Sequence, residues 1–211
     1  MEEAMFTDEE KQFFDQQQAL LEEKYLAGIN PRQQSGSGRN EQDWERYRRV
    51  VTAPIDKDGT FLDVGCANGL LMESVTRWAA QDGFSIEPYG VDISRKLAEL
   101  ARQRLPRWRD RIFVGNALVW SAPLRFDFVR TEMVYVPNHL RRRYAEHLLE
   151  EVVAPGGCLI ACSYGSSRPQ GIRAEPLVDE FSRWGLSVAD VHDVVSPEHG
   201  FVVTRAISVR R

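Results

Sequence analysis

The chain has 211 residues, of which 43% are hydrophobic and 27% are charged. These proportions exclude wholesale disorder and predict one packed α/β domain with an N-terminal extension, because two full domains would be cramped in this length. A formal net charge of -4 gives no general attraction to phosphate backbones, so nucleic acid is not expected as a partner.

No stretch of the sequence approaches the roughly 18 to 20 apolar residues that cross a bilayer, and the acidic start is unlike a secretory signal. We therefore expect a cytoplasmic protein that makes no membrane contact. Only four of the 27 basic residues are lysines, a bias that indicates a GC-rich bacterial genome. Cys66, Cys158 and Cys162 lack the paired spacing of a metal site, so we expect reduced structural thiols and no bound metal.

Residues 1–53 are predicted to form a helical extension that caps the domain. Thr7 followed by Glu10 is a capping-box pattern, which marks the start of a helix. An apolar stripe then recurs at helical intervals, at Phe14, Leu21 and Tyr25. Breakers and small residues fill the segment 30–40, which we expect to be a flexible loop, and a second helix is expected over 41–51. The loop is either a linker or a flap over the active site.

Residues 54–211 are predicted to form the domain itself, because short apolar strands alternate with amphipathic helices from Thr60 onward. The expected strands lie at about 60–64, 88–93, 111–114, 126–130, 158–164, 188–195 and 201–209. A long helix is expected over 138–153, and a turn over 154–157. The last two strands are separated by only five residues, 196–200, which permits an antiparallel hairpin and no parallel crossover. The sheet should therefore be mostly parallel, with its last strand reversed.

The segment from Phe61 to Leu71 reads FLDVGCANGLL, in which a strand enters a turn of small residues that opens a helix. Gly65, Ala67 and Gly69 have little or no side chain, so the backbone can approach a ligand closely. A dinucleotide fingerprint would need glycine at positions 65, 67 and 70, where this chain has alanine and leucine at the last two. A nicotinamide cofactor is therefore not expected.

The motif DVGCANG resembles the first motif of class I S-adenosyl-L-methionine (SAM)-dependent methyltransferases, an acid followed by G-x-G-x-G, with Ala67 in place of the middle glycine. The family's further motifs follow in order: YGVDIS, FVGNA, RFDFV and LLEEVVAPGGCLI. Together they cover about Thr60 to Tyr164. The resemblance implies a three-layer Rossmann-like fold, SAM as the cofactor and S-adenosyl-L-homocysteine (SAH) as the product.

The resemblance also implies a set of cofactor-binding residues. Asp92, at the end of the second strand, would accept hydrogen bonds from both ribose hydroxyls, and Asn116 would read the adenine edge. Asp63 would orient the loop or the methionine amine. The complete expected set is Asp63, Gly65, Cys66, Ala67, Gly69, Asp92, Ile93, Asn116, Ala117 and Arg130. Two structural alternatives stay open: Asp92 as a helix cap shared with Ser94, and Asn116 as a simple turn residue.

The acceptor wall is expected beyond the fourth strand, where Arg130 to His139 concentrates polar groups. Methyl transfer is an in-line displacement, so the enzyme must position the nucleophile and, for a weak one, remove a proton. Glu132 and His139 are the candidate bases, and Tyr135 is a candidate orienting group. The alternatives are that Glu132 pairs with Arg130 and that His139 caps the next helix.

The expected function is methyl transfer from SAM to a small-molecule oxygen, nitrogen or carbon acceptor, by a monomer or homodimer. A small molecule is favoured because the chain has no appended RNA-binding module and no N/D-P-P-Y/F motif after the fourth strand, where YVPNH stands instead. The alternatives are a methyltransferase acting on protein or RNA, and a non-catalytic SAM-binding or interaction protein.

Overall fold

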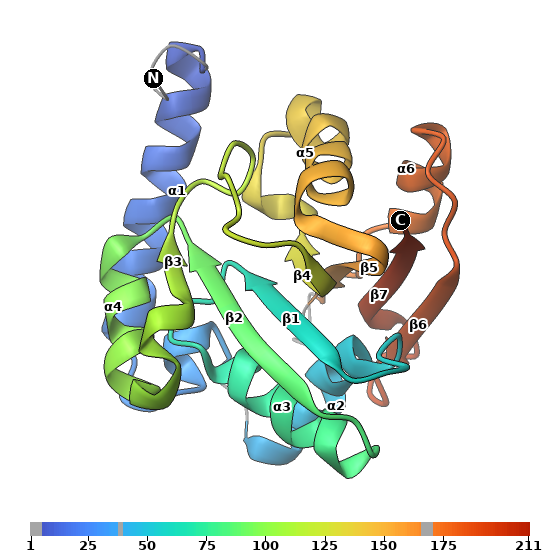
Figure 1. The fold of residues 1–211 in the computed structure, drawn as a ribbon, viewed down its shortest axis with the longest axis horizontal. Coiled ribbons are helices and arrows are strands. Elements are labelled where there is room, and N and C mark those ends of the chain that lie inside the picture. The colour runs from blue at the N-terminus through green and yellow to red at the C-terminus, as the bar shows by residue number, and fades with distance from the viewer. Residues whose placement is uncertain (1–5, 38–39, 166–170) are drawn as a thin grey trace.

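The computed structural model describes residues 6–37, 40–165 and 171–211. One seven-stranded sheet forms its centre, in the order β3-β2-β1-β4-β5-β7-β6 (Figure 1). The strands are β1 (Gly59–Val64), β2 (Ile86–Asp92), β3 (Ile112–Val114), β4 (Phe126–Glu132), β5 (Val153–Tyr164), β6 (Asp190–Val195) and β7 (Val202–Arg210). β7 alone runs antiparallel to its neighbours, β5 and β6. The predicted mostly parallel sheet with a reversed last strand is confirmed.

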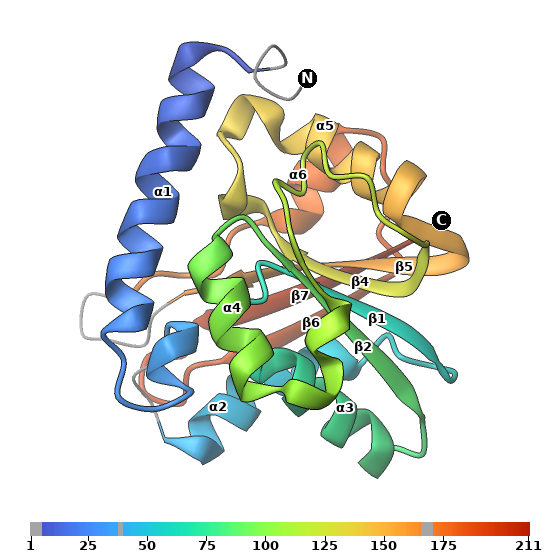
Figure 2. The ribbon, with the colours of Figure 1, turned by 60° about the vertical axis from the view of Figure 1, so that its left-hand side comes forward.

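Helices cover both faces of the sheet and complete three layers. Figures 1 and 2 show α2, α3 and α4 on one face and α5 and α6 on the other. The helices are α1 (Asp8–Leu26), α2 (Glu41–Arg48), α3 (Leu70–Gln81), α4 (Arg95–Arg104), α5 (Arg141–His147) and α6 (Leu177–Arg183). In the part of the chain that the structure describes, no helix is long and apolar enough to cross a membrane.

Neighbouring residues of β1 send their side chains into two different cores. Phe61 is fully buried with Val75 and Trp78 of α3, whereas Leu62 is fully buried with side chains of α5 and α6 such as Tyr144. Side chains alternate between the faces of a strand, so a strand that is apolar on both sides requires a helical layer on each. This double burial fixes the register of β1 and with it the position of the loop that follows.

Two predicted elements differ from the structure. The helix expected over 138–153 is a succession of a 3₁₀ turn, the two-turn helix α5 and a π-helical turn at Leu148–Val152. The turn expected over 154–157 is wrong: β5 begins at Val153, opposite Phe126, and resumes pairing at Cys158, opposite Phe128. The intervening residues form a bulge within the strand, with Gly156 at a φ of 72°.

The N-terminal segment lies at the end of the sheet where β1 and β2 terminate (Figure 1). The predicted capping box is present in α1, because the Thr7 side chain accepts from Glu10 N–H and the Glu10 carboxylate accepts from Thr7 N–H. Phe14, on the apolar side of the helix, packs in the hydrophobic core. The predicted loop 30–40 contains a short 3₁₀ turn at Gln33–Ser35, and residues 38 and 39 lie outside the described residues.

Candidate functional site

A cavity of about 260 Å³ opens at the carboxyl edge of the sheet. The ends of β1, β2, β4 and β5 form its floor, and side chains of α1 and α2 close it from the other side. Nine of the ten residues predicted to bind the cofactor line it: Asp63, Gly65, Cys66, Ala67, Asp92, Ile93, Asn116, Ala117 and Arg130. Ligands bind at this edge in open α/β sheets, so the topology and the sequence motifs point to the same place.

Gly69, the tenth predicted cofactor residue, is not among the residues that line the cavity. It precedes α3 in a left-handed conformation, with a φ of 73°. A Cβ at this position would lie 2.6 Å from Leu105 Cδ1, far inside van der Waals contact. A larger residue here would require the end of the Leu105 side chain to shift, in addition to straining the left-handed turn.

The loop between β1 and α3 brings backbone close to the cavity. Gly65 and Ala67 both have positive φ values, 73° and 46°, so Ala67 adopts a conformation that L-residues other than glycine disfavour. The phenol ring of Tyr135 packs onto Gly65, and a Cβ there would fall 2.7 Å from ring carbon Cε2. Any side chain at position 65 would thus collide with Tyr135.

Asp92 is buried at the end of β2, where it holds two loops together. One carboxylate oxygen accepts from Ala67 N–H and the other from Ser94 N–H, both at 2.8 Å. Burial raises the pKa of Asp92 to about 6, against the opposing effect of these hydrogen bonds. Each oxygen retains a lone pair for a further donor. Of the alternative in which Asp92 and Ser94 share the helix cap, Ser94 caps α4, since its hydroxyl accepts from Leu97 N–H, while Asp92 accepts from the N–H of Ser94 itself.

Asn116 lies both in a turn and on the cavity wall. Its side-chain oxygen accepts from Leu118 N–H at 3.1 Å, and its main-chain carbonyl accepts from Trp120 N–H at 2.8 Å. These bonds orient the amide beside Ala117, which also lines the cavity. The two interpretations of Asn116 from the sequence are therefore compatible.

A buried charge network joins β1 to β4 on the cavity wall. Arg130 Nη1 lies 3.2 Å from Asp63 Oδ1 and donates to the Tyr135 hydroxyl at 3.1 Å, while Nη2 pairs with Glu132. Tyr135 in turn donates to Glu132 at 2.8 Å. Burial raises the pKa of Tyr135 well above its usual value, so its phenol stays protonated. The alternative that Glu132 pairs with Arg130 is thus observed, and Glu132 still lines the cavity.

His139, the other candidate base, is not among the cavity-lining residues. Its Nε2 lies 2.9 Å from Glu10 Oε1 of α1, and 63% of the side chain is exposed. Its observed contact is with the N-terminal helix, so it does not share a site with Glu132 and Tyr135.

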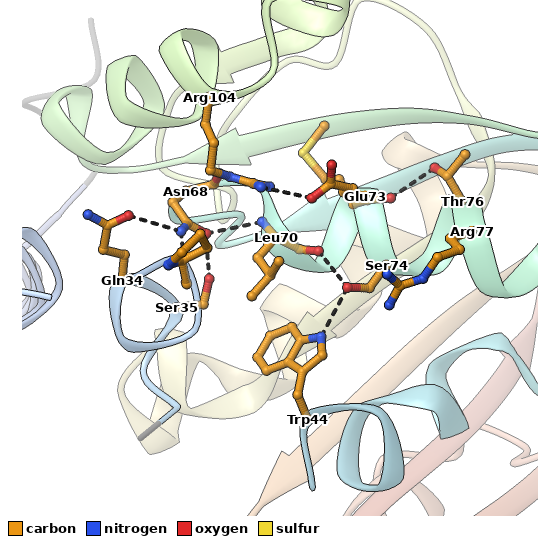
Figure 3. A network of polar contacts seen from close by, with 12 residues as sticks. Gln34, Ser35, Trp44, Asn68, Leu70, Glu73, Ser74, Thr76, Arg77 and Arg104 are labelled. Carbon is orange, nitrogen blue, oxygen red and sulfur yellow. Dashed lines mark hydrogen bonds and ion pairs between the residues drawn. The ribbon is translucent and has the colours of Figure 1, made fainter. Parts of the chain in front are cut away.

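Asn68, a residue that the sequence did not single out, connects the loop after β1 to the N-terminal segment (Figure 3). It is fully buried. Its Nδ2 donates to Pro31 O at 2.8 Å, and its Oδ1 accepts from Ser35 Oγ and from Leu70 N–H. No periodicity marks Asn68, and its partners Pro31 and Ser35 are more than thirty residues away along the chain. Only its position inside the motif could have drawn attention to it.

The cysteines and acidic residues make no metal centre in the described ranges, where no group of three or more His, Cys, Asp or Glu side chains could hold an ion. Cys66, Cys158 and Cys162 are free and buried, as expected for structural thiols. Burial raises the pKa of the Cys66 thiol well above its usual value, so this cavity residue is neutral at physiological pH.

Residues 61–157 match the family model described as "Methyltransferase domain". No curated protein sequence matches the chain. Among solved structures, the [4+2]-cyclase SpnF is 19% identical, with 83% of this chain and 85% of that one covered and a TM-score of 0.62.

Two further solved structures carry methyltransferase names. The N-methyltransferase NodS from Bradyrhizobium japonicum is 17% identical, with 81% and 96% of the chains covered and a TM-score of 0.58. The 1,6-didemethyltoxoflavin-N1-methyltransferase from Burkholderia thailandensis, with bound 1,6-didemethyltoxoflavin and S-adenosylhomocysteine, is 17% identical, with 82% and 79% covered and a TM-score of 0.58. At these identities the shared feature is the fold, which agrees with the fold predicted from the sequence.

Proposed function

We propose, from the membership of residues 61–157 in the methyltransferase-domain family and from the class I methyltransferase fold of the chain, that the protein transfers a methyl group from SAM to a small-molecule oxygen, nitrogen or carbon acceptor. The observation that carries the proposal is the buried carboxylate of Asp92 on the cavity wall. It ends the second strand of the sheet, where a carboxylate is suited to accept from ribose hydroxyls.

The residues at this end of the cavity fit an adenosine group. Both oxygens of Asp92 are oriented by backbone N–H groups and keep acceptor capacity. Asn116 and Ala117 supply amide and backbone groups for the adenine edge, and Ile93 supplies apolar surface. Asp63, Gly65, Cys66, Ala67 and Arg130 would surround the methionine portion. When bound, SAM supplies a methyl group activated by the positive charge on sulfur.

The remaining tasks belong to the chain: it must position the acceptor and receive its proton. Glu132 is the proposed proton acceptor, because its carboxylate lines the cavity and is held in place by Arg130 and Tyr135. Tyr135 is the proposed orienting group, since its protonated hydroxyl is a hydrogen-bond donor. Arg130 Nη2, which pairs with the Glu132 carboxylate, compensates its charge.

Labelled SAM provides the test of this proposal. The purified full chain is incubated with methyl-labelled SAM and the small-molecule fraction of a cell extract, and label is followed into new low-mass products. Wild type should transfer label, Asp92→Ala should lose it, and Asp15→Ala, an exposed acid on α1, should retain it. If wild type binds SAH in a calorimeter but labels nothing in extracts from several growth conditions, methyl transfer to a small molecule is refuted.

A second candidate, a SAM-binding protein without methyl transfer, is favoured by one observation. The Tyr135 ring lies directly on Gly65 and so occupies space beside the proposed methionine portion. Tyr135→Ala distinguishes the two candidates. In an enzyme, removing the hydroxyl that orients Glu132 should lower turnover; in a closed binding protein, removing the ring should tighten SAH binding while no label is transferred.

A further inference from the structure

The helix that carries Arg48 is firmly attached beside the cavity. Trp44, one turn earlier in α2, is buried, and its indole Nε1 donates to Ser74 Oγ of α3 at 3.0 Å (Figure 3). Ser74 Oγ donates in turn to Leu70 O at 2.8 Å. Because residues four apart lie on one face of a helix, this anchor directs Arg48 toward the same side, where it lines the cavity.

The guanidinium of Arg48 lies against two aromatic rings. Its Cζ is 3.4 Å from the centroid of the Tyr164 ring and 5.4 Å from that of Trp44. Stacking on rings engages the flat faces of a guanidinium and leaves the N–H groups at its edge able to donate. The rings therefore fix the orientation of Arg48 without using its hydrogen-bonding capacity.

No carboxylate pairs with Arg48 in the described part of the chain, where its contacts are with the rings of Tyr164 and Trp44. Its neighbour Arg49, by contrast, forms ion pairs with Glu45 and Asp82, at 2.8 and 2.9 Å. An arginine that lines a cavity and pairs with no carboxylate of the described residues is suited to bind an anionic group, above all a carboxylate, whose two oxygens can accept from two of its N–H groups at once.

One further polar atom beside Arg48 is buried and lacks a partner among the described residues: Tyr164 Oη. Tyr164 lines the same cavity as Arg48, and the guanidinium stacks on its ring. A buried donor without a partner is destabilising. A ligand whose acceptor oxygen reaches Tyr164 Oη would remove this cost.

The position of Tyr164 separates this region from the adenosine end of the cavity. Tyr164 ends β5 and Asp92 ends β2, and the sheet order separates these strands by three intervals, about 14 Å at the usual strand spacing. The adenosine end at Asp92 is therefore remote from Arg48. We infer that Arg48 and Tyr164 form a carboxylate-binding subsite, so that the methyl acceptor is a carboxylate-bearing small molecule. This inference rests on the proposed function.

Benzoate and benzamide provide a probe for the subsite, because they share a ring and differ in charge. Each is titrated into the full chain saturated with SAH, and binding is followed by calorimetry. Benzoate should bind wild type more tightly than benzamide. Arg48→Gln should weaken benzoate at least about tenfold, the size of a lost charge-assisted hydrogen bond, and leave benzamide unchanged. Arg48→Lys should recover part of the lost benzoate affinity, because lysine keeps the positive charge but cannot donate two parallel hydrogen bonds to a carboxylate.

Arg46→Gln is the matched control, since Arg46 is an exposed residue of the same helix and should leave benzoate binding at the wild-type level. Equal affinities of benzoate and benzamide in wild type would overturn the inference. So would a loss of SAH affinity in Arg48→Gln, which would assign the arginine to the cofactor's own carboxylate. Wild type that fails to bind SAH refutes the proposed function instead, and the benzoate titration without SAH then still tests the subsite.

Discussion

The carboxylate of Asp63 and the guanidinium of Arg130 lie 3.2 Å apart, at paired positions of β1 and β4, with 2% and 3% of their side chains exposed. Asp63→Ala removes one of the two carboxylates that pair with Arg130 and leaves Glu132 to compensate its charge. The variant should therefore lower the free energy of unfolding by about 1–3 kcal/mol, the cost of losing a charge-assisted hydrogen bond in a buried site, measured by urea denaturation. Glu45→Ala, which breaks the exposed pair with Arg49, should cost less than about 1 kcal/mol. Equal losses in the two variants would contradict this interpretation.

The affinity for SAH should depend on the ionisation of Asp92. Its pKa is raised from 3.8 to about 6, so the carboxyl group becomes protonated, and loses an acceptor, as the pH falls through about 6. Below that value the affinity should fall about tenfold per pH unit. Asp92→Asn should bind weakly at every pH, with no change around 6. Calorimetric titrations at several pH values measure both, and a flat wild-type profile would argue against a ribose contact.

The raised pKa of Asp92 also determines how the stability of the protein without ligand changes with pH. Because the pKa of Asp92 is raised on folding, the folded state takes up a proton between about pH 4 and 6 that the unfolded state does not hold. The contribution of Asp92 to stability is therefore present at low pH and is lost as the pH rises through this range. Bound SAH would favour the ionised form of Asp92, so it should reduce this loss of stability.

Ala67 adopts a φ of 46°, a left-handed conformation that costs a residue with a Cβ about 1–2 kcal/mol. Ala67→Gly should raise the free energy of unfolding by up to about 1 kcal/mol, once the greater chain entropy of glycine is subtracted. Ala98→Gly, inside α4, should lower it by a similar amount, because that alanine is helical and fully buried. Thermal or urea unfolding measures the stability of both variants. If both substitutions changed the free energy of unfolding in the same direction, the inferred strain at Ala67 would be contradicted.

Glu22 holds α1 to the start of α4, accepting from Ser94 Oγ at 2.6 Å and from Lys96 Nζ at 2.8 Å. Hydrogen bonds from Lys96, Ser94 and Gln18 outweigh desolvation and lower the pKa of Glu22 from 4.5 to about 2. A depressed pKa means that this stabilisation is complete above about pH 4.5 and is lost as the pH falls toward 2.

Glu22→Gln should therefore increase opening of α1 about 10- to 100-fold at pH 7, the effect of losing charge-assisted hydrogen bonds. Hydrogen exchange of the α1 amides measures this opening. Glu23→Gln, at an exposed neighbouring position, should behave as wild type. Protection of α1 that is the same in all three proteins would show that apolar packing around Phe14 holds the helix by itself.

The fold and most of the cofactor site could be predicted because their signals are local. Alternating apolar strands and helices define the sheet, and Asp92 and Asn116 are recognisable because Asp92 ends β2 and Asn116 lies just after the end of β3. The bulge at 154–157 was missed because Pro155, Gly156 and Gly157 have the composition of a turn, whereas pairing with β4 on both sides keeps them within the strand.

Contacts between distant segments could not be predicted, since periodicity identifies the face of a helix but not its partner. His139 meets Glu10 across 129 positions of the chain, which removes it from the cavity. Arg48 was one of several arginines in the N-terminal extension with no feature to distinguish it. Its stacking on Tyr164 arises only when α2 docks on α3 through Trp44 and Ser74.

Asn68 ties the entry of a ligand to the integrity of the N-terminal segment. Its side chain is shared between Pro31 and Ser35 on one side and Leu70 N–H, at the start of α3, on the other. If the segment moved away, the fully buried side-chain amide of Asn68 would lose its hydrogen bonds to Pro31 and Ser35. The first turn of α3, whose Leu70 N–H donates to the same amide, would be destabilised as well. On the proposed function, bound SAM would therefore face this backbone conformation only while the N-terminal segment is docked.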